Sequence, residues 1–255
     1  MWLRKHALLL SLVLSFATVA AVADDAKPRT GYFTVSTTTQ ELLGDEGAAA
    51  LAEIFDAGES LEWQLSVPAN YDPDKPAGVI VFVNNWSKGG GRKSYVPVFE
   101  DKNLIWIGPI NAGEGVSLDK RYMKAMLAAT IVGQDYAVDT NRIYVGGFSS
   151  GAYVAAMLAT SKPELFKGAM FAGGALFWED KTPPGIDLLR QNRYVFIAGQ
   201  NDLALDTVKR TAQAYRAAGI TNTKVLVMKN RRQEMPGEGY FAQAIDYLDG
   251  VEASE

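Results

Sequence analysis

A serine between two glycines stands where an apolar segment gives way to an alanine-rich one. Residues 147–151 read Gly-Phe-Ser-Ser-Gly and match the pattern G-x-S-x-G. In a sharp turn from a strand to a helix, such glycines leave room for the close approach of the two elements, and the serine hydroxyl is exposed. The pattern therefore predicts Ser149 at the position of a nucleophile for acyl transfer. A glycine-rich turn with a helix-capping serine is the alternative interpretation.

A nucleophilic serine normally needs an imidazole base, and the chain contains a single histidine, His6. His6 lies in an N-terminal segment with two basic residues, an apolar run and the small-residue sequence Ala-Val-Ala. This order is typical of a secretory signal peptide, so we expect residues 1–23 to be cleaved and the mature protein to be secreted or periplasmic. The apolar run is short for a membrane span, and an uncleaved N-terminal anchor is the alternative.

Composition and charge exclude several functional classes. The net charge of −4 becomes −6 when residues 1–23, which include Arg4 and Lys5, are removed. Because no basic cluster exceeds the one around Arg231 and Arg232, we expect no nucleic-acid partner. The chain has no cysteine, so it forms no disulfide and offers no thiolate ligand. We therefore expect no metal and no cofactor.

The turn must be positioned by a larger framework, which the apolar pattern indicates. Continuous apolar runs, which are typical of strands covered on both faces, alternate with segments of helical composition. We therefore expect an α/β protein with a mostly parallel central sheet, helices on both faces and functional loops at the carboxyl ends of the strands. Residues 24–255 are predicted to form a single domain. The expected strands are 29–38, 60–67, 79–85, 103–109, 142–147, 168–174, 193–199 and 224–229, and the expected helices are 44–60 (with a surface turn), 119–134, 151–160, 204–218 and 239–250.

The serine turn with its flanking segments, "NRIYVGGFSSGAYVAAMLAT", resembles the α/β-hydrolase family. The similarity is to its secreted serine esterases of the polyhydroxybutyrate-depolymerase and feruloyl-esterase type, and it implies an α/β-hydrolase fold without a large cap domain. By this resemblance Ser149 is the nucleophile and the backbone N–H of Ser150 is one oxyanion donor. Relatives commonly carry His-Gly in the loop that provides the second donor. This chain has Asn84-Asn85-Trp86 there, and Trp86 is our candidate for that donor.

The resemblance also implies positions for the acid and the base of a triad. The acid would follow the strand "VFIAG", which places Asp202 there; a solvated turn or a helix-capping aspartate is the alternative, and Asp206 falls on the expected helix. The base would precede Pro236 and the last helix, and this alignment puts Gln233 where histidine is expected. A shift of one residue would put Arg232 or Glu234 there, again without an imidazole.

Three functional hypotheses follow from a serine turn without histidine. The first is an esterase-like protein with an impaired triad, which binds a small-molecule or polymeric ester-like ligand or a partner, because glutamine cannot accept the serine proton. The second is an active carboxylic-ester hydrolase in which Asp202, Glu234 or Lys229 replaces the histidine. The third is a carbohydrate- or polymer-binding module, for which the candidate rim aromatics are Trp86, Tyr95, Trp178 and Tyr240. A short cap segment over the site is expected at 178–184.

Overall fold

The computed structural model describes residues 28–178 and 182–251. The predicted signal peptide, residues 1–23, lies outside the described residues, and so do 179–181 of the expected cap segment. In chain order the elements are β1 (Gly31–Thr37), α2 (Thr39–Ala50), β2 (Leu61–Val67), β3 (Ala77–Val83), η2 (Lys93–Tyr95), α3 (Val96–Asp101), β4 (Leu104–Pro109), α4 (Leu118–Asp135), β5 (Val138–Phe148), α5 (Ser150–Ser161), β6 (Gly168–Ala172), α6 (Ile186–Gln191), β7 (Arg193–Gly199), α7 (Leu205–Ala217), β8 (Thr223–Met228) and α8 (Glu238–Leu248).

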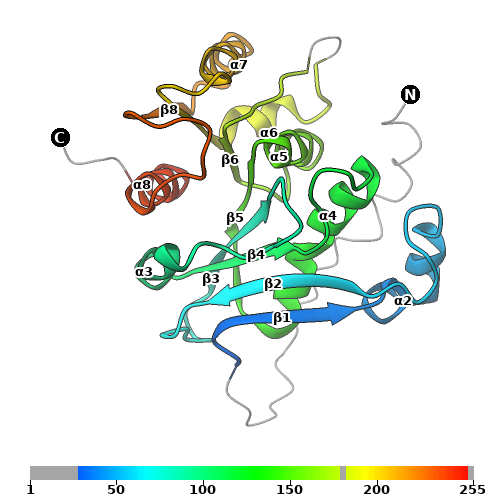
Figure 1. Ribbon diagram of the computed structural model, residues 1–255. Coiled ribbons are helices and arrows are strands. Elements are labelled where there is room, and N and C mark those ends of the chain that lie inside the picture. The colour runs from blue at the N-terminus through cyan, green and yellow to red at the C-terminus, as the bar shows by residue number, and fades with distance from the viewer. Residues whose placement is uncertain (1–27, 179–181, 252–255) are drawn as a thin grey trace.

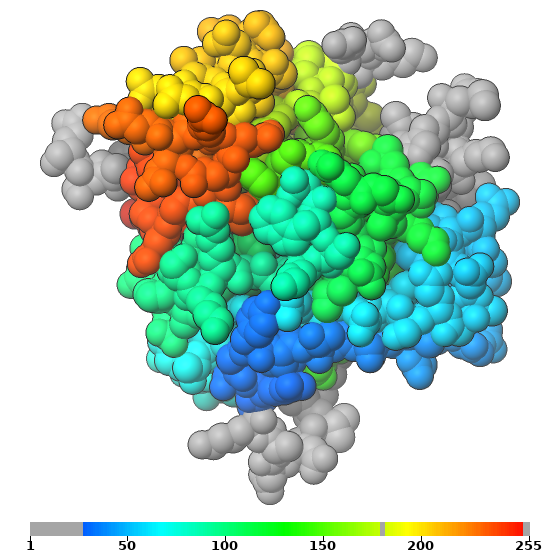
Figure 2. Space-filling model, in the orientation of Figure 1, coloured from blue at the N-terminus to red at the C-terminus, as the bar shows by residue number. Residues whose placement is uncertain are grey.

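The eight strands form one sheet in the order β1-β2-β4-β3-β5-β6-β7-β8 (Figure 1). The pairings of β1 with β2 and of β2 with β4 are antiparallel, and every other pairing in this sheet is parallel. The N-terminal strands therefore lie at one end of the molecule and the C-terminal segments at the other, as the blue and the yellow-to-red surfaces of Figure 2 show. This arrangement confirms the predicted α/β class and its mostly parallel sheet.

Helices cover both faces of the sheet, and each face has its own apolar core. One core joins the sheet to α4, α5, α6 and α7, and the other joins it to α3 and α8. Figure 1 shows α3 and α8 on one side of the central strands and α4 and α5 on the other. All seven residues of β3 are buried, because a strand in the middle of such a sheet has no face in contact with solvent. The continuous apolar runs in the sequence reflect this double burial.

The early helix differs from its predicted position, because α2 begins at Thr39 and the prediction placed a helix at 44–60. Its start is fixed by a capping box: the Thr38 hydroxyl accepts a hydrogen bond from the Glu41 N–H, and the Glu41 carboxylate accepts one from the Thr38 N–H. Gly44 interrupts the helix with a φ of 70°, a conformation that favours glycine. The sequence prediction missed the capping residues and used the later alanines instead.

Several tyrosines lie in the cores, and their burial makes the fold sensitive to alkaline pH. Tyr194 and Tyr215 are at most 1% exposed, and burial raises the pKa of both hydroxyls. Burial likewise raises the pKa of Tyr136 to about 12. A raised pKa in the folded state contributes stability that is fully present below the unfolded value of about 10 and is lost as the pH rises above it.

We therefore expect the urea midpoint of unfolding to be flat from about pH 7 to 9 and to fall steeply above about pH 10. Each further pH unit costs about 1.4 kcal/mol for every tyrosine that stays protonated in the fold. Urea titrations across this range, with tyrosinate absorbance followed in parallel, measure the effect. A midpoint that stays constant beyond about pH 10.5 would contradict the assignment of these tyrosines as buried neutral groups.

No helix in residues 28–178 or 182–251 has both the length and the apolar character needed to cross a membrane.

Candidate active site

The predicted serine turn joins β5 to α5 at the carboxyl end of the sheet. Ser149 has φ 54° and ψ −120°, a strained conformation for a residue with a side chain. Its N–H donates to the carbonyl of Ala172 at the end of β6 (2.8 Å), and its side chain makes no capping hydrogen bond. The half-buried Ser149 hydroxyl therefore does not cap α5, which argues against the alternative interpretation of a turn with a helix-capping serine.

Two glycines make this turn possible. A Cβ atom on Gly147 would lie 2.2 Å from the carbonyl oxygen of Gly151, and one on Gly151 would lie 2.0 Å from the carbonyl oxygen of Val83. The first turn of α5 is thus pressed against the end of β3, which leaves no space for a side chain. The G-x-S-x-G spacing is explained by these contacts.

Gln233 lies beside Ser149, in the loop between β8 and α8. Its Nε2 atom donates to the Gly173 carbonyl (2.9 Å) and is 3.4 Å from the Ser149 Oγ atom, to which it also donates. Ser149 Oγ is therefore the acceptor in this contact. A general base would have to accept the serine proton instead.

Asp202 lies in the loop after β7, also next to Gly173. Asp202 is 8% exposed; Oδ1 accepts a hydrogen bond from the Ala204 N–H (2.8 Å), and Oδ2 is buried with no hydrogen-bond partner in residues 28–178 or 182–251. A Cβ atom on Gly173 would lie 3.6 Å from Asp202 Oδ2 and 3.2 Å from Gln233 Cγ. The three sequence-predicted positions, Ser149, Asp202 and Gln233, thus come together around the backbone of Gly173.

The other candidate bases are placed less favourably. Lys229 is exposed, whereas a neutral lysine base requires burial. Glu234 faces Arg231, with 3.5 Å between the carboxylate and the guanidinium. Arg232 is exposed, and its carbonyl oxygen packs against Gly199 at the end of β7. Of the three residues considered for the histidine position, only Gln233 has a recorded contact with Ser149.

The oxyanion side of the site is formed by the start of α5 and the loop after β3. Ser150 is the first residue of α5, so its N–H belongs to the first turn, where backbone donors have no partner within the helix. The loop residue Trp86 is 41% exposed, and its ring lies 5.7 Å from that of Phe148. The first turn of α5 and the Trp86 ring therefore both lie beside the serine turn.

A residue that the sequence did not single out, Arg121, supports this side. Arg121 is 7% exposed; its Nε atom donates to the Ala112 carbonyl (2.8 Å), and its Nη2 atom donates to the Ser150 Oγ atom (3.1 Å). Burial lowers the pKa of Arg121, and the negative charge of Glu114 opposes this effect. No local signal marks a single basic residue near the start of a helix, so the sequence could not reveal its role.

We expect Arg121→Met to reduce the free energy of unfolding by about 2–4 kcal/mol, because the Ala112 carbonyl and the Ser150 hydroxyl lose their donor in a buried setting. Urea unfolding measures the loss. Arg210→Met is the matched control, since Arg210 is exposed and bonds only the nearby Thr207 hydroxyl (3.2 Å) among the recorded contacts. A loss equal to that of the control would contradict a structural role of the guanidinium.

One of the predicted rim aromatics is placed differently by the structure. Tyr95 is fully buried, its ring stacks on that of Phe241 (4.3 Å between centroids), and its hydroxyl donates to the Pro236 carbonyl. It therefore belongs to the core under α8 and not to a rim, because its position between α3 and α8 removes it from solvent. Tyr240 is half-buried, with its hydroxyl near the Lys229 N–H (3.2 Å).

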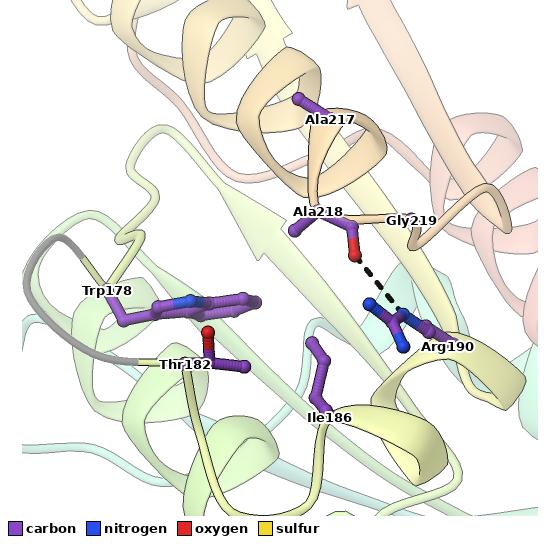
Figure 3. Close-up of a pocket in the computed structure, with 7 residues that line it drawn as sticks. All are labelled: Trp178, Thr182, Ile186, Arg190, Ala217, Ala218 and Gly219. Atoms are coloured by element: carbon purple, nitrogen blue, oxygen red, sulfur yellow. Dashed lines mark hydrogen bonds between the residues drawn. The ribbon is translucent and has the colours of Figure 1, made fainter.

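A cavity of about 350 Å³ lies between α6, the end of α7 and the segment after β6. Figure 3 shows the face of the Trp178 ring on one side of this space, with Ile186 nearby and the hydrogen bond from Arg190 Nε to the Ala218 carbonyl (3.3 Å) across from it. Trp178 also stacks on Phe177. None of the three predicted triad positions lines this cavity, and within the described residues no group of three or more acidic, cysteine or histidine side chains is arranged to hold a metal ion.

Comparisons with known proteins place these features among hydrolases. The model of the prolyl oligopeptidase family matches residues 118–228, which is less than half of the chain. A poly(3-hydroxyalkanoate) depolymerase C from Paucimonas lemoignei is 28% identical over 102 residues. That match covers 36% of this chain and only 23% of the depolymerase.

Solved structures agree over most of the chain at low sequence identity. A thermostable esterase has a TM-score of 0.60 at 15% identity and covers 86% of this chain, which spans 62% of that structure. The feruloyl esterase module from Clostridium thermocellum has a TM-score of 0.59 at 12% identity, with coverages of 87% and 90%. An S-formylglutathione hydrolase from Staphylococcus aureus has a TM-score of 0.59 at 13% identity, with coverages of 89% and 96%. With the sheet order and the strained serine turn, these similarities identify the chain as a protein of the α/β-hydrolase fold.

Proposed function

We propose that this chain is an exported esterase-like protein that binds an ester-type ligand at Ser149 and hydrolyses it poorly, because Gln233 occupies the position of the base. The observation that carries the proposal is the 3.4 Å contact in which Gln233 Nε2 donates to Ser149 Oγ. A carboxamide has no lone pair on nitrogen that can take the serine proton near neutral pH. Ser149 therefore stays a neutral hydroxyl.

The size of the expected defect follows from other serine hydrolases. Removal of the histidine from a triad costs on the order of 10⁶ in turnover, while binding and the oxyanion donors still give a residual acceleration of about 10³ over water. Backbone donors such as the Ser150 N–H, held in place by the strained turn, supply this residual acceleration in serine hydrolases. Ligand binding is thus expected to survive where efficient turnover does not.

The ligand class is supported by the comparisons and by the open surroundings of the site. The names of the similar proteins describe a poly(3-hydroxyalkanoate) depolymerase and a feruloyl esterase. The half-buried Ser149 and the exposed Trp86 ring leave the site accessible from solvent. An ester in a short or a polymeric chain suits such a site. The signal-peptide pattern of residues 1–23 supports export, to the periplasm or the medium.

A second candidate function is favoured by one observation. Asp202 carries a buried carboxylate oxygen that has no partner in the part of the chain that the structure describes, and a carboxylate can act as a general base. In this case the chain would be an active ester hydrolase with Ser149 as nucleophile and Asp202 as base. The position of Gln233 at the serine hydroxyl favours the impaired site over this alternative.

Hydrolysis of p-nitrophenyl butyrate by the mature chain, beside Ser149→Ala, distinguishes the two candidates. We expect the two rates to agree within about threefold, since a serine without its base adds little to turnover. Binding of ethyl butyrate, followed by NMR line broadening, should remain measurable in the wild type and weaken in Trp86→Ala. Turnover that Ser149→Ala removes, together with labelling of Ser149 by a fluorophosphonate, would refute the impaired site and favour the second candidate.

A further inference from the structure

The Asp202 Oδ2 atom is an unsatisfied polar group of the site, and within the described residues Asn84 Oδ1 and Asn85 Oδ1, in the loop after β3, are also buried without a partner. Asp202 is more than nine-tenths buried, yet within the described residues this oxygen has no hydrogen-bond partner. An unsatisfied buried acceptor destabilises the fold, and more so when it is charged. A site that keeps such a group has a strong preference for a donor that reaches it.

The space next to this oxygen is occupied by a side chain that can leave. Gln233 is exposed, and Gln233 Cγ and Asp202 Oδ2 both lie against Gly173. Its carboxamide makes one hydrogen bond of ordinary length, to the Gly173 carbonyl (2.9 Å), and the longer contact to Ser149 Oγ (3.4 Å). Rotation of Gln233 towards solvent therefore opens a path between Asp202 and Ser149.

The energies favour an N–H donor over the glutamine. A hydrogen bond to a charged group is stronger than a neutral one such as that of Gln233. A ligand that donates to the Asp202 carboxylate thus offsets the loss of the Gln233 contacts. Gly173 has no side chain that would block the approach.

We propose that the ligand of this site carries an imidazole-type ring, which displaces the Gln233 carboxamide, donates one N–H to Asp202 Oδ2 and presents its second nitrogen to Ser149 Oγ. The inference rests on the proposed function, because it assigns to the ligand the base that the chain lacks. The ring needs two nitrogens on opposite sides, since it must donate to the carboxylate and accept from the serine at the same time.

The chemical step balances without any further reactant. The free ring nitrogen takes the proton of Ser149 Oγ as this oxygen bonds to the ester carbonyl carbon. The carbon–oxygen bond to the alcohol then breaks, and the ring returns the proton to the leaving alkoxide. Water attacks the acyl-serine in the same way, giving the acid and restoring the serine. The Asp202 side chain holds the protonated ring through the N–H that the ring donates to Oδ2.

Neighbouring charges disfavour a permanently cationic ligand. Arg231 and Arg232 precede Gln233 and are both exposed, and Arg121 lies behind Ser150. A primary ammonium group would be repelled by these arginines and, being protonated at neutral pH, could not accept the serine proton. An imidazole-type ring has a pKa of about 6.5, so most of it is neutral above about pH 7 and able to accept the serine proton.

The test adds imidazole to the mature chain and to three variants during hydrolysis of p-nitrophenyl butyrate. With the wild type we expect the rate of hydrolysis to rise with the imidazole concentration and then to saturate. The increase should be about tenfold or more larger than the increase with Ser149→Ala, which reports catalysis by free imidazole. Gln233→Ala should reach half-saturation at a lower imidazole concentration than the wild type. Asp202→Asn should lose the saturable rise. Asparagine has a single side-chain oxygen, so it cannot accept hydrogen bonds from both the ring and the Ala204 N–H at the positions of Oδ2 and Oδ1.

A second probe needs no variant and so does not depend on folding of the mutants. 1-Methylimidazole lacks the N–H that Asp202 requires, and we expect it to give no saturable rise with the wild type. Equal increments in the wild type and in Ser149→Ala, or an equal effect of the two imidazoles, would overturn the inference. The rates without imidazole test the proposed function separately: Ser149-dependent turnover there would overturn that proposal, whatever imidazole does.

Discussion

Gln233→His is expected to raise kcat/KM for p-nitrophenyl butyrate by about 10²- to 10⁴-fold, the range that a positioned general base contributes. The Gln233 side chain already contacts Ser149 Oγ. It also lies against Gly173, and Asp202 Oδ2 lies against the same glycine. An imidazole at position 233 can therefore donate to this oxygen and accept the serine proton, which satisfies a buried acceptor that has no partner within the described residues.

Steady-state kinetics of Gln233→His beside two double variants measure this gain. Adding Ser149→Ala or Asp202→Asn to Gln233→His should remove most of it, because the nucleophile or the orienting carboxylate is then missing. Gln200→His is the matched control, since Gln200 lies on the neighbouring loop and its Oε1 atom only accepts from the Asn230 N–H (3.1 Å) among the recorded contacts. An equal rate in Gln233→His and the control would show that the rest of the site is not organised for catalysis.

The second large effect concerns the fold: Gly151→Ala is expected to cost about 3 kcal/mol or more of the free energy of unfolding. The added Cβ atom would lie 2.0 Å from the Val83 carbonyl oxygen. This oxygen belongs to the backbone of a strand in the middle of the sheet, so it cannot move aside as a flexible side chain would. The first turn of α5 must shift instead, and the serine turn with it.

Urea unfolding compares this variant with Gly239→Ala. Gly239 lies in α8, and a Cβ atom there meets nothing within 4 Å. The control should therefore gain about 0.5–1 kcal/mol, as expected when alanine replaces glycine in a helix. Opposite signs for the two substitutions are the expected result, and a cost below about 1 kcal/mol for Gly151→Ala would mean that α5 does not press on β3 as closely as the structure has it.

The sheet could be predicted from the sequence because its central strands are apolar on both faces. The run 193–199 coincides with β7, and the run 79–85 overlaps β3 with a shift of two residues at each end. The beginning of β5 could not be found in this way, since its first residues include the polar Asp139, Thr140 and Asn141, which carry no apolar pattern. The strands were therefore predicted from the apolar pattern that burial requires, and not from strand propensity.

The proximity of the site residues could be predicted from the sequence for a different reason. In a parallel sheet the carboxyl ends of neighbouring strands meet at one edge, so residues that follow β5, β7 and β8 had to lie near one another. Arg121 lies on α4, and its contact with Ser150 depends on how two helices pack. Tyr95 likewise follows a glycine-rich loop, and its burial results from packing against α8. Such contacts between distant segments leave no local pattern in the sequence.

The strand order also has a consequence for synthesis of the chain. β3 ends at Val83 and pairs on one side with β5, which ends at Phe148. At elongation rates of about 5–20 residues per second, the ribosome needs roughly 3–13 seconds to make the intervening 65 residues. During this interval an entirely apolar strand, "AGVIVFV", has an unpaired edge, which is the kind of segment that associates with other nascent chains. The strand at the centre of the finished sheet is thus the part of the growing chain that most needs a chaperone.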